Sequence, residues 1–524
     1  MANVMLSRVQ QRQAQRRVRS HASHLPGGTL LRGCADAVTP ARVVMANPAC
    51  DLDGRQPCEH ALVDGGLNKA LYDYEAVLQA RFDSVEQTLQ AVARLPRDET
   101  FPAQAQQLTR ARLGFELPAE MLKRSWIEGL DMAALYAHCL FEAVRVSAKQ
   151  APQEQDDWLH GMVIDDEFIA ECGYHTLDIT PCADGRLQGL LPFVLRIAPT
   201  SESVLLKAYA GALFDIDLDL SDWTQRELAQ RLSARLGARY LKMAVYHYSS
   251  SAPSKEGCAA HGSDEGAARS AAITRLEQLR YGVAHAFGAG LGPDILVLGL
   301  DTDLDAIRVH LPDAQGEPSE AVAVEAAQIY RETLGMPVAQ ARAHIMQSVD
   351  RAAASVGSSA SAGLKRLVTQ LIEANLSQIE YVIQHHEGRY AHLGHGERFI
   401  CVGDSIDELQ MRNLYYFAHL DTLEEGAACV DVGLNIFEKL NLSRGFPVPI
   451  MVHFHYASVI PGARERAAER CKRVMRGIQA RYAGRVPDGA LKFALCVSDV
   501  TGAESLCLIG EYCVRSVRQE GYDA

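Results

Sequence analysis

The sequence predicts an α+β protein in which α/β-like sheet domains follow a helical amino-terminal domain. Between about residues 60 and 150, apolar side chains recur at steps of three and four, which is typical of amphipathic helices. From about 158 to 385, short apolar runs alternate with helical segments, as in a buried sheet covered by helices. The remainder of the chain repeats part of that second pattern, which predicts a related sheet domain.

The composition is that of a water-soluble globular protein. The chain has 524 residues, of which 48% are hydrophobic and 22% charged, enough for roughly three domains. Its net charge of −13 argues against nucleic-acid binding. No apolar run reaches the length of about 18 residues that a membrane helix needs. Thirteen cysteines are scattered without a regular framework, so we expect a reducing, cytosolic compartment where they are buried or bind metal.

Residues 1–55 are predicted to form a disordered basic tail. Six arginines precede the first acidic residue, Asp36: Arg8, Arg12, Arg16, Arg17, Arg19 and Arg32. A segment this basic and this poor in apolar residues does not bury enough surface to fold alone. The composition also fits an organelle transit peptide, a tail that docks on an acidic partner, or a solvated tail without a specific role.

Residues 56–150 are predicted to form a helical domain for packing or oligomer contacts. One long amphipathic helix ends near Pro96 and carries a single apolar stripe: Leu67, Leu71, Tyr74, Leu78, Phe82, Val85, Leu89 and Val92. A second helical run extends from Leu122 to about Val146. Residues 150–157 are rich in Gln, Pro and acidic side chains and are expected to form a linker.

Residues 155–388 are predicted to form the domain that carries the chemistry. Its expected strands and helices, in order, are a strand near 175–180, strands Phe193–Ile197 and Ser203–Phe214, a helix Trp223–Leu236, a strand Leu241–Tyr248, a helix Ala267–Phe287 and a strand Ile295–Leu300. Asp301 and Asp303 follow the last strand, and we expect them to form a turn that caps the next helix.

The first candidate site is the stretch that follows the first of these strands. Cys182, Asp184 and Arg186 occupy every second position, which would direct a thiolate, a carboxylate and a guanidinium to one side. A thiolate beside a charge-paired carboxylate is suited to binding zinc and activating a zinc-bound water. The alternative is a buried cysteine next to an Asp–Arg salt bridge in a turn.

Residues 389–524 are predicted to form a degenerate repeat of the preceding domain, without a zinc site. His247-Tyr248 and His455-Tyr456 both end apolar strands, and each precedes a helix start rich in Gly and Ala. We place Phe399–Asp404 against Ile179–Asp184. The segment after His247 is about a dozen residues longer than its counterpart and contains Cys258, and the second copy lacks an equivalent of Arg186. Duplication followed by loss of one site explains both differences.

Cys182, His247 and Cys258 therefore form a candidate zinc site, with one zinc ion per chain. Three protein ligands and a vacant fourth position make a catalytic zinc site, whereas four protein ligands make a structural one. Asp184, held ionised by Arg186, would orient the water bound to such a zinc ion.

This combination resembles the β-type carbonic anhydrases, whose zinc motif includes Cys-x-Asp-x-Arg. The wider sequence is similar to a divergent branch, the carboxysomal shell or ε-type carbonic anhydrases. Similarity runs from about residue 60 to 515 and is carried by Asp178–Pro192, Lys207–Asp217, Tyr240–Ser250, His261–Ser263, Asp301–His310, Ser377–Tyr381 and Gly462–Arg466. In ordinary β-type enzymes two residues separate the ligand His from the second ligand Cys. Here ten separate His247 from Cys258, a departure that fits the divergent branch.

The resemblance implies a lyase that interconverts CO2 and bicarbonate inside the carboxysome, a bacterial microcompartment in the cytoplasm, and supplies CO2 to Rubisco for carbon fixation. It implies zinc ligands Cys182, His247 and Cys258, with Asp184 and Arg186 as the catalytic pair. It also implies that the basic tail binds Rubisco or carboxysome shell proteins. We expect no nucleic-acid or membrane partner. We expect a homo-oligomer, a dimer or a multiple of dimers, although the internal repeat can supply the usual pairing of β-type sites within one chain.

Several alternatives stay open. His261 is either a fourth zinc ligand, a proton shuttle or a loop histidine, and His175 is either structural or a shuttle. A histidine-rich stretch at the domain junction is either a second metal site or a solvated linker: His385, His386, His392 and His395. The competing functions are a non-catalytic, zinc-stabilised tethering protein of the shell and a different zinc hydrolase. The zinc-deaminase and H-E-x-x-H signatures are both missing.

Overall fold

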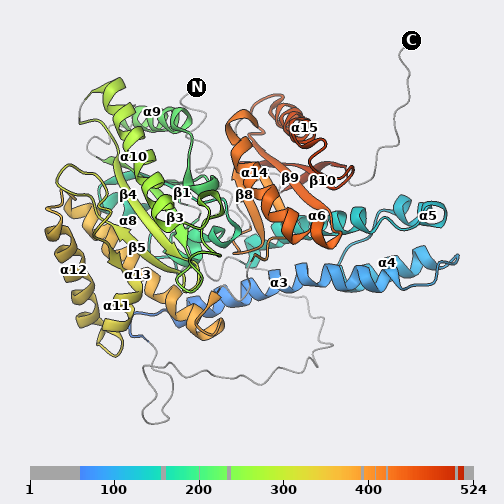
Figure 1. Ribbon diagram of the computed structural model, residues 1–524, viewed down its shortest axis with the longest axis horizontal. Helices are drawn as coiled ribbons and strands as arrows, with labels where there is room; N and C mark the ends of the chain where they lie inside the picture. Colours follow the sequence, from blue (N-terminus) through green and yellow to red (C-terminus); the bar gives the residue numbers. More distant parts are fainter. Residues whose placement is uncertain are drawn as a thin grey trace, which may run out of the picture.

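Three regions build the protein: a helical region, a first sheet region and a second sheet region. The computed structural model describes residues 60–154, 161–199, 201–232, 238–288, 290–390, 395–406, 409–420, 423–501 and 506–512. The predicted tail, residues 1–55, lies outside these ranges. Of the predicted linker, residues 150–157, the first five belong to the helix Met132–Glu154 and not to a linker, and residues 155–157 lie outside the described ranges. Figure 1 shows the two sheet regions side by side, with the long helix α3 running along both. In the described residues no helix is long and apolar enough to span a bilayer.

The helical region consists of α3 (Gly65–Ala93), α4 (Phe101–Leu113), α5 (Ala119–Glu128) and α6 (Met132–Glu154). The side chain of Asp64 caps α3 by accepting a hydrogen bond from the Leu67 N–H at 2.9 Å. The predicted apolar stripe is buried along the whole of α3. The run predicted after Leu122 is two helices, because Gly129 (φ 78°) adopts a left-handed conformation between them.

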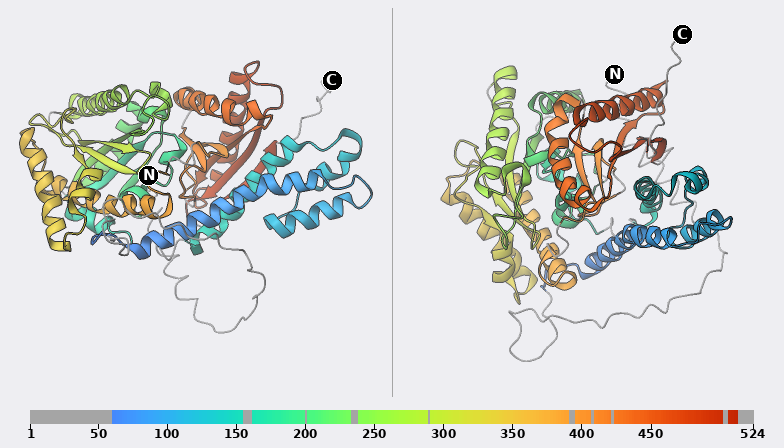
Figure 2. Two further views of the ribbon diagram at one scale, coloured as in Figure 1. Left: turned by 60° about the horizontal axis from the view of Figure 1, so that its bottom comes forward. Right: turned by 45° about the vertical axis from the view of Figure 1, so that its right-hand side comes forward.

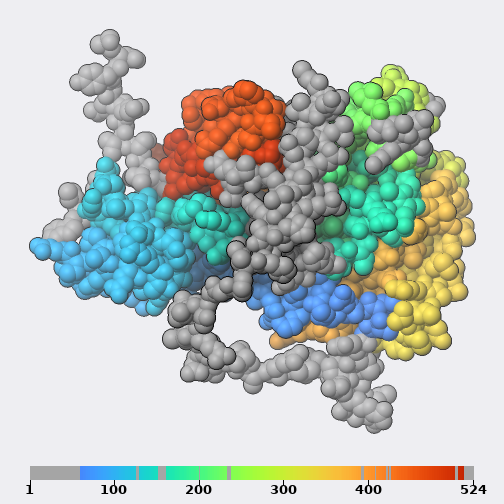
Figure 3. All heavy atoms as spheres, turned by 180° about the vertical axis from the view of Figure 1, so that it is seen from behind, coloured from blue at the N-terminus to red at the C-terminus, as the bar shows by residue number. Residues whose placement is uncertain are grey.

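The helical region contacts both sheet regions. Helix α6 packs on α3 and on the second sheet, and α3 also contacts α13 (Ala362–His385) of the first sheet region. Seen from behind, the end of the helical region that includes α4 and α5 extends beyond the two sheet regions (Figure 3). The predicted packing helices therefore span the junction of the two sheet regions.

The first sheet region contains a six-stranded sheet in the order β2-β1-β3-β4-β5-β6. Its first four strands are parallel, β5 runs antiparallel to β4, and β6 runs antiparallel to β5. The strands are β1 (Tyr174–Pro181), β2 (Val204–Leu206), β3 (Arg239–Tyr248), β4 (Asp294–Asp301), β5 (Ala306–His310) and β6 (Val324–Glu325). Because β1 and β3 are parallel, with Pro181 paired to Val245, residues that follow them emerge at the same edge of the sheet.

Helices cover this sheet as the alternating pattern predicts. They are α8 (Asp166–Glu171), α9 (Ile216–Leu232), α10 (Glu265–Phe287), α11 (Ala326–Thr333), α12 (Val338–Ser355) and α13. Helix α10 packs on β3 and β4, α8 contacts β1, and α11 and α13 contact β5. Figure 2 shows these helices around the strands of the first sheet region.

Two predicted strands of this region were wrong. The run Phe193–Ile197 is not a strand: most of it belongs to a wide helical turn, η2 (Leu190–Leu195), bounded by Gly189 (φ 72°) and Arg196 (φ 52°). Only Val204–Leu206 of the run Ser203–Phe214 is a strand, and a short 3-10 turn, η3 (Ala210–Ala212), follows it. A short apolar run does not by itself distinguish a buried strand from a buried turn of helix. In both segments, residues with positive φ interrupt the extended conformation that a strand needs.

The second sheet region repeats the topology of the first. Its five strands are β7 (Phe399–Gly403), β8 (Tyr415–His419), β9 (Val448–Tyr456), β10 (Leu491–Asp499) and β11 (Cys507–Tyr512), in the order β11-β10-β9-β7-β8. Four are parallel and β11 is antiparallel. Read from the other edge, this order and these directions match β2-β1-β3-β4-β5. Helices α14 (Leu423–Leu440) and α15 (Ala463–Tyr482) cover the strands.

The strand registers correct one detail of the predicted repeat. His247 and His455 match, since Tyr248 pairs with Asp301 in one sheet and Tyr456 with Asp499 in the other. Asp404, however, matches Cys182 rather than Asp184. The N–H of Cys182 donates to the carbonyl of Val245, two residues before His247. The N–H of Asp404 donates to the carbonyl of His453, two residues before His455. The sequence comparison was two residues out because an apolar run alone does not define strand register.

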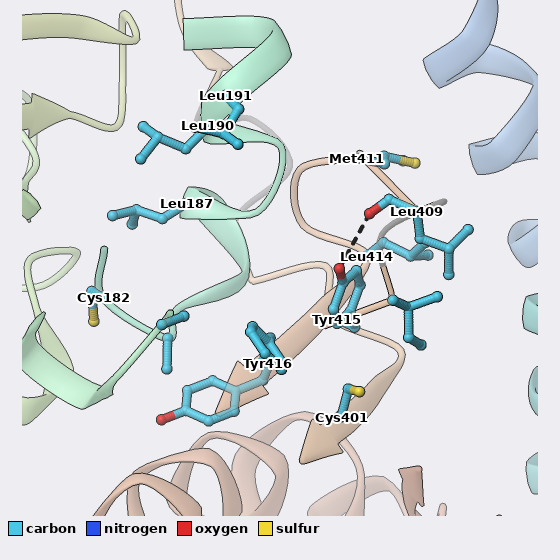
Figure 4. Packing of buried hydrophobic residues seen from close by; sticks show 14 of the residues in the cluster. Cys182, Leu187, Leu190, Leu191, Cys401, Leu409, Met411, Leu414, Tyr415 and Tyr416 are labelled. Carbon is cyan, nitrogen blue, oxygen red and sulfur yellow. Dashed lines mark hydrogen bonds between the residues drawn. The ribbon is translucent and has the colours of Figure 1, made fainter. Parts of the chain in front are cut away.

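The two sheet regions are joined through β8. Its Phe417 N–H donates to the Ala183 carbonyl at 3.1 Å, and its His419 N–H donates to the Ala208 carbonyl at 2.9 Å. Figure 4 shows the apolar side of this junction, where Leu187 and Leu190 of the first region lie opposite Tyr416 and Leu414 of the second. The residues that follow β1 are thus buried between the two sheet regions.

Candidate metal centre

The structure brings Cys182, His247 and Cys258 together. Cys182 follows β1, His247 is next to last in β3, and Cys258 precedes the short 3-10 turn η4 (Ala259–His261). Their ligand atoms all lie within 4.8 Å of one another, and the two sulfur atoms are 3.8 Å apart. All three side chains are buried. Parallel pairing of β1 with β3 explains why residues 65 positions apart reach one point.

The donor set fits a soft divalent metal. Both thiols are free, and neither ring nitrogen of His247 has a hydrogen-bond partner among the described residues, although the ring is completely buried. Buried polar atoms in native proteins are nearly always satisfied. Two thiols and one imidazole around a common point are a typical ligand set for zinc with one open position.

The two thiols are hydrogen-bonded to each other, with 3.8 Å between the sulfur atoms. Their mutual hydrogen bond lowers the pKa of Cys258, helped by backbone N–H groups of Ala260 and His261. The same hydrogen bond, together with burial, raises the pKa of Cys182 well above its ordinary value. The N–H of Gly211 also points at the Cys182 sulfur, at 3.2 Å. A bound metal cation would stabilise both thiolates.

Asp184 and Arg186 form a buried, two-pronged ion pair beside this cluster. Arg186 Nε donates to Asp184 Oδ1 and Arg186 Nη2 donates to Oδ2, both at 2.9 Å. Burial alone would raise the pKa of Asp184, but the charge and hydrogen bonds of Arg186 lower it well below its ordinary value. Asp184 Oδ2 lies 3.8 Å from His247 Nε2. An ionised, acceptor-only carboxylate therefore borders the candidate metal centre.

Arg186 also links the pair to the loop that carries Cys258. Its Nη1 donates to the carbonyl of Glu256 at 2.6 Å, and its Nη2 approaches the carbonyl of Gly257 at 3.4 Å. One guanidinium thus fixes the carboxylate and the segment that leads into the third candidate ligand. These hydrogen bonds hold the end of the long loop between His247 and Cys258 in place beside the Asp184–Arg186 pair.

Residues of the second sheet region hold the turn between Asp184 and Arg186 from outside. Glu397 Oε1 accepts a hydrogen bond from the Gly185 N–H at 3.2 Å, and the Asn413 N–H donates to the Gly185 carbonyl at 2.8 Å. Arg412 Nε donates to the Arg186 carbonyl at 2.8 Å. A Cβ atom on Gly185 would meet the Glu397 side chain at 2.5 Å, so any larger residue here would displace that buried side chain. Sequence reasoning missed these contacts because nothing near residue 185 signals them.

Arg412 connects this turn to the helical region. Its guanidinium pairs with the buried carboxylate of Asp305 and lies 3.8 Å above the ring of Tyr390. The Tyr390 hydroxyl donates to Glu75 of α3, which is fully buried. All three regions of the protein therefore meet behind the Asp184–Arg186 pair.

The other histidines singled out from the sequence lie outside the ligand set. His261 Nε2 is 3.4 Å from the carbonyl of Gly211, and His175 Nε2 is 3.0 Å from Glu227. His385 stacks on Tyr72 of α3, His386 Nε2 is 3.5 Å from Glu75, and His392 lies outside the described residues.

Asp301 and Asp303 do not cap a following helix as expected. Their carboxylates accept hydrogen bonds from Ser249, Ser250 and Ser251, which follow β3. These bonds hold the start of the loop that carries Cys258.

A second group of ligand-type side chains adjoins the first. Asp184, His395 and Glu397 have ligand atoms within 4.8 Å of one another. His395 belongs to the histidine-rich stretch of the sequence, but only the packing of the second sheet region against the first brings it to Asp184. The spacing His-x-Glu was the sole sequence signal, and it is too common to be informative.

Comparisons with known proteins identify the class of fold and site. Family models described as the N-terminal, catalytic and C-terminal domains of Carboxysome Shell Carbonic Anhydrase match residues 60–152, 164–395 and 396–512, respectively. The carboxysome shell carbonic anhydrase of Halothiobacillus neapolitanus is 42% identical over 467 residues, covering 86% of this chain and 90% of the relative. The protein of the same name from a Prochlorococcus marinus strain is 40% identical over 480 residues, covering 90% and 92%. The chain therefore belongs to the carboxysome shell carbonic anhydrase family.

Proposed function

We infer that this protein is a carbonic anhydrase that interconverts CO2 and bicarbonate in the carboxysome. The observation that carries this function is the buried cluster of Cys182, His247 and Cys258 beside the Asp184–Arg186 ion pair. Two thiolates, one imidazole and an adjacent ionised carboxylate are the parts needed for metal-assisted hydration. The two relatives reported above, which cover 86% and 90% of this chain, carry the same activity in their names.

In the proposed mechanism Cys182, His247 and Cys258 would hold zinc, which would supply Lewis-acid activation of water near neutral pH. Asp184 accepts a hydrogen bond from the attacking water at Oδ2, the oxygen that faces His247. Because the ionised carboxylate only accepts, it turns the water so that a lone pair points away from Asp184 toward CO2. Arg186 keeps Asp184 ionised and fixes its orientation through two hydrogen bonds.

We propose that the second sheet region is a degenerate copy of the first, with no zinc of its own. The shared strand order supports this relation. Asp404 takes the place of Cys182, and its carboxylate accepts the N–H of His455 at 2.8 Å. His455, in the place of His247, has its Nδ1 2.8 Å from Ser498 Oγ. The ligand atoms of the copy are thus engaged within the protein, and its retained role is to hold the turn at Gly185.

The first test measures CO2 hydration by stopped flow on the purified protein, with zinc quantified on the same sample. We expect fast turnover and about one zinc ion per chain. One zinc ion per chain without turnover in reducing buffer would contradict the enzyme and leave the non-catalytic tethering protein. Two zinc ions per chain would contradict the degenerate copy.

For partners, we propose that residues 1–55 bind Rubisco or carboxysome shell proteins through their arginines. The charge of the tail opposes the net charge of −13 of the whole chain and suits an acidic surface. Replacing the six arginines before Asp36 by glutamine in the full-length protein should weaken co-sedimentation with Rubisco or shell proteins at least tenfold and leave CO2 hydration unchanged. Binding that survives the replacement, or that is insensitive to salt, would contradict this role.

We also propose that the protein forms a homo-oligomer, either a dimer or a multiple of dimers. Sedimentation velocity would test this proposal.

A further inference from the structure

His395 and Glu397 form a pair between the buried Asp184–Arg186 ion pair and solvent. They lie just before β7, where the chain enters the second sheet region. The side chain of Glu397 is completely buried, whereas that of His395 is 31% exposed. Glu397 Oε1 lies 3.2 Å from His395 Nδ1, and Glu397 Oε2 has no hydrogen-bond partner among the described residues. A buried carboxylate with one oxygen unsatisfied is costly, so its position calls for a functional explanation.

The contact with Glu397 sets the chemistry of the imidazole. With Nδ1–H donated to the carboxylate, the remaining nitrogen, Nε2, is the one that gains and loses a proton. The imidazole and the Asp184 carboxylate have ligand atoms within 4.8 Å of each other, a distance that one water molecule can bridge. His395 therefore borders the Asp184 carboxylate and is at the same time 31% exposed to solvent.

The proposed reaction creates a need for such a group. Hydration of CO2 by water yields bicarbonate and one proton, which has to leave a buried site in every turnover. Asp184 is not placed to deliver this proton to solvent, because both of its oxygens accept hydrogen bonds from Arg186 and the pair is buried. His175 and His261 are directed to Glu227 and Gly211.

We propose that His395 carries the proton between the site and bulk water, with Glu397 as its positioning residue. This role rests on the proposed carbonic anhydrase activity. In the hydration direction a proton passes from the attacking water through a bridging water to Nε2 of His395, and then to buffer or solvent. Nδ1 keeps its proton throughout, Glu397 stays ionised, and the reverse path serves dehydration.

The charges around His395 suit this task. Burial lowers its pKa, but the hydrogen bond to Glu397 and the charges of Asp184 and Glu397 raise it, against a smaller opposing effect of Arg186. The result is a pKa above the ordinary value of 6.5. A relay group works best when its pKa lies near the operating pH.

The test is a stopped-flow measurement of the zinc-loaded His395→Gln enzyme at low and high buffer concentration. We expect kcat at low buffer to fall about 10- to 100-fold, a usual range for a lost proton-transfer group. The value of kcat/KM for CO2 should change less than twofold, because proton export follows the steps that this ratio reports. Added imidazole should restore kcat in a saturable way, which no purely structural role predicts.

Two further variants sharpen the test. Glu397→Gln should lower kcat at low buffer and move the acid limb of the kcat profile to lower pH, because the imidazole loses its negative partner. The matched control is His344→Gln, which removes a half-buried histidine paired with Glu332 at 2.7 Å on helices remote from the second sheet region (Figure 1). It should leave kcat and its buffer dependence unchanged.

Three outcomes would overturn the relay: an unchanged kcat of His395→Gln at low buffer, a loss that imidazole does not restore, or a parallel fall of kcat/KM. Failure of the proposed function is distinguishable, because the unsubstituted protein would then show no turnover.

Discussion

Asp184→Asn is expected to lower the turnover of CO2 hydration by about a thousandfold while zinc stays bound. Loss of a positioned carboxylate in a proton-handling role typically costs 10²- to 10⁴-fold in rate. An amide has one acceptor oxygen and presents an NH2 donor, so it does not match both donors of Arg186 and also accept from the attacking water. Stopped-flow rates and zinc content measured on one preparation test this result.

The same substitution should also destabilise the protein. It leaves the buried guanidinium of Arg186 without a counter-charge, which costs about 3–5 kcal/mol. The pKa of Asp184 is lower in the folded state than its ordinary value of 3.8. Its contribution to stability is therefore fully present above about pH 4 and lost only as the pH falls through the folded-state pKa. The difference in Tm between Asp184→Asn and the unsubstituted protein should be constant from pH 6 to 8.

A matched control separates lost stability from lost chemistry. Asp219 of α9 is equally buried and pairs with Lys207 and Lys242, away from the metal centre. Asp219→Asn should lower Tm by a similar amount and leave turnover within about threefold, as expected for a purely structural ion pair. A turnover of Asp184→Asn equal to that of Asp219→Asn would remove Asp184 from the mechanism.

Cys258→Ala is expected to abolish zinc binding and, with it, nearly all turnover. Only Cys182 and His247 would remain as ligands, fewer than the three of a catalytic zinc site. Because zinc binds the folded chain and stabilises it, the variant should also lose the rise in Tm that the unsubstituted protein shows between chelator-treated and zinc-loaded forms. Metal analysis after desalting, with thermal unfolding on the same samples, measures both effects.

Cys172→Ala is the control for this prediction. Cys172 is a buried free thiol at the end of α8, outside the metal centre. Its replacement should keep one zinc ion per chain. If Cys258→Ala also kept one zinc ion and normal turnover, the third ligand would have to be another residue, and His261 would be the first to test.

Local patterns in the sequence predicted a large part of the fold. The apolar stripe of α3, the strands β3 and β4 and the helix α10 all appear where periodicity placed them. These elements carry their signal within 8 to 29 consecutive residues. The predictions for Phe193–Ile197 and Ser203–Phe214 were wrong, because short apolar runs in the centre of a protein lack the polar side that distinguishes strand from helix.

For the candidate site, the sequence alone was sufficient to select Cys182, Asp184, Arg186, His247 and Cys258. Their chemical types are unusual together, and parallel strands bring their ends to one edge of a sheet. Tertiary structure decided the rest: the contacts of Glu397, Arg412 and Asn413 with the turn at Gly185, the place of His395, and the register that puts Asp404 in the position of Cys182. Those contacts join residues more than 200 positions apart through backbone groups and packing. Such partners are set by how two domains dock, and that docking depends on many weak contacts with no local sequence pattern.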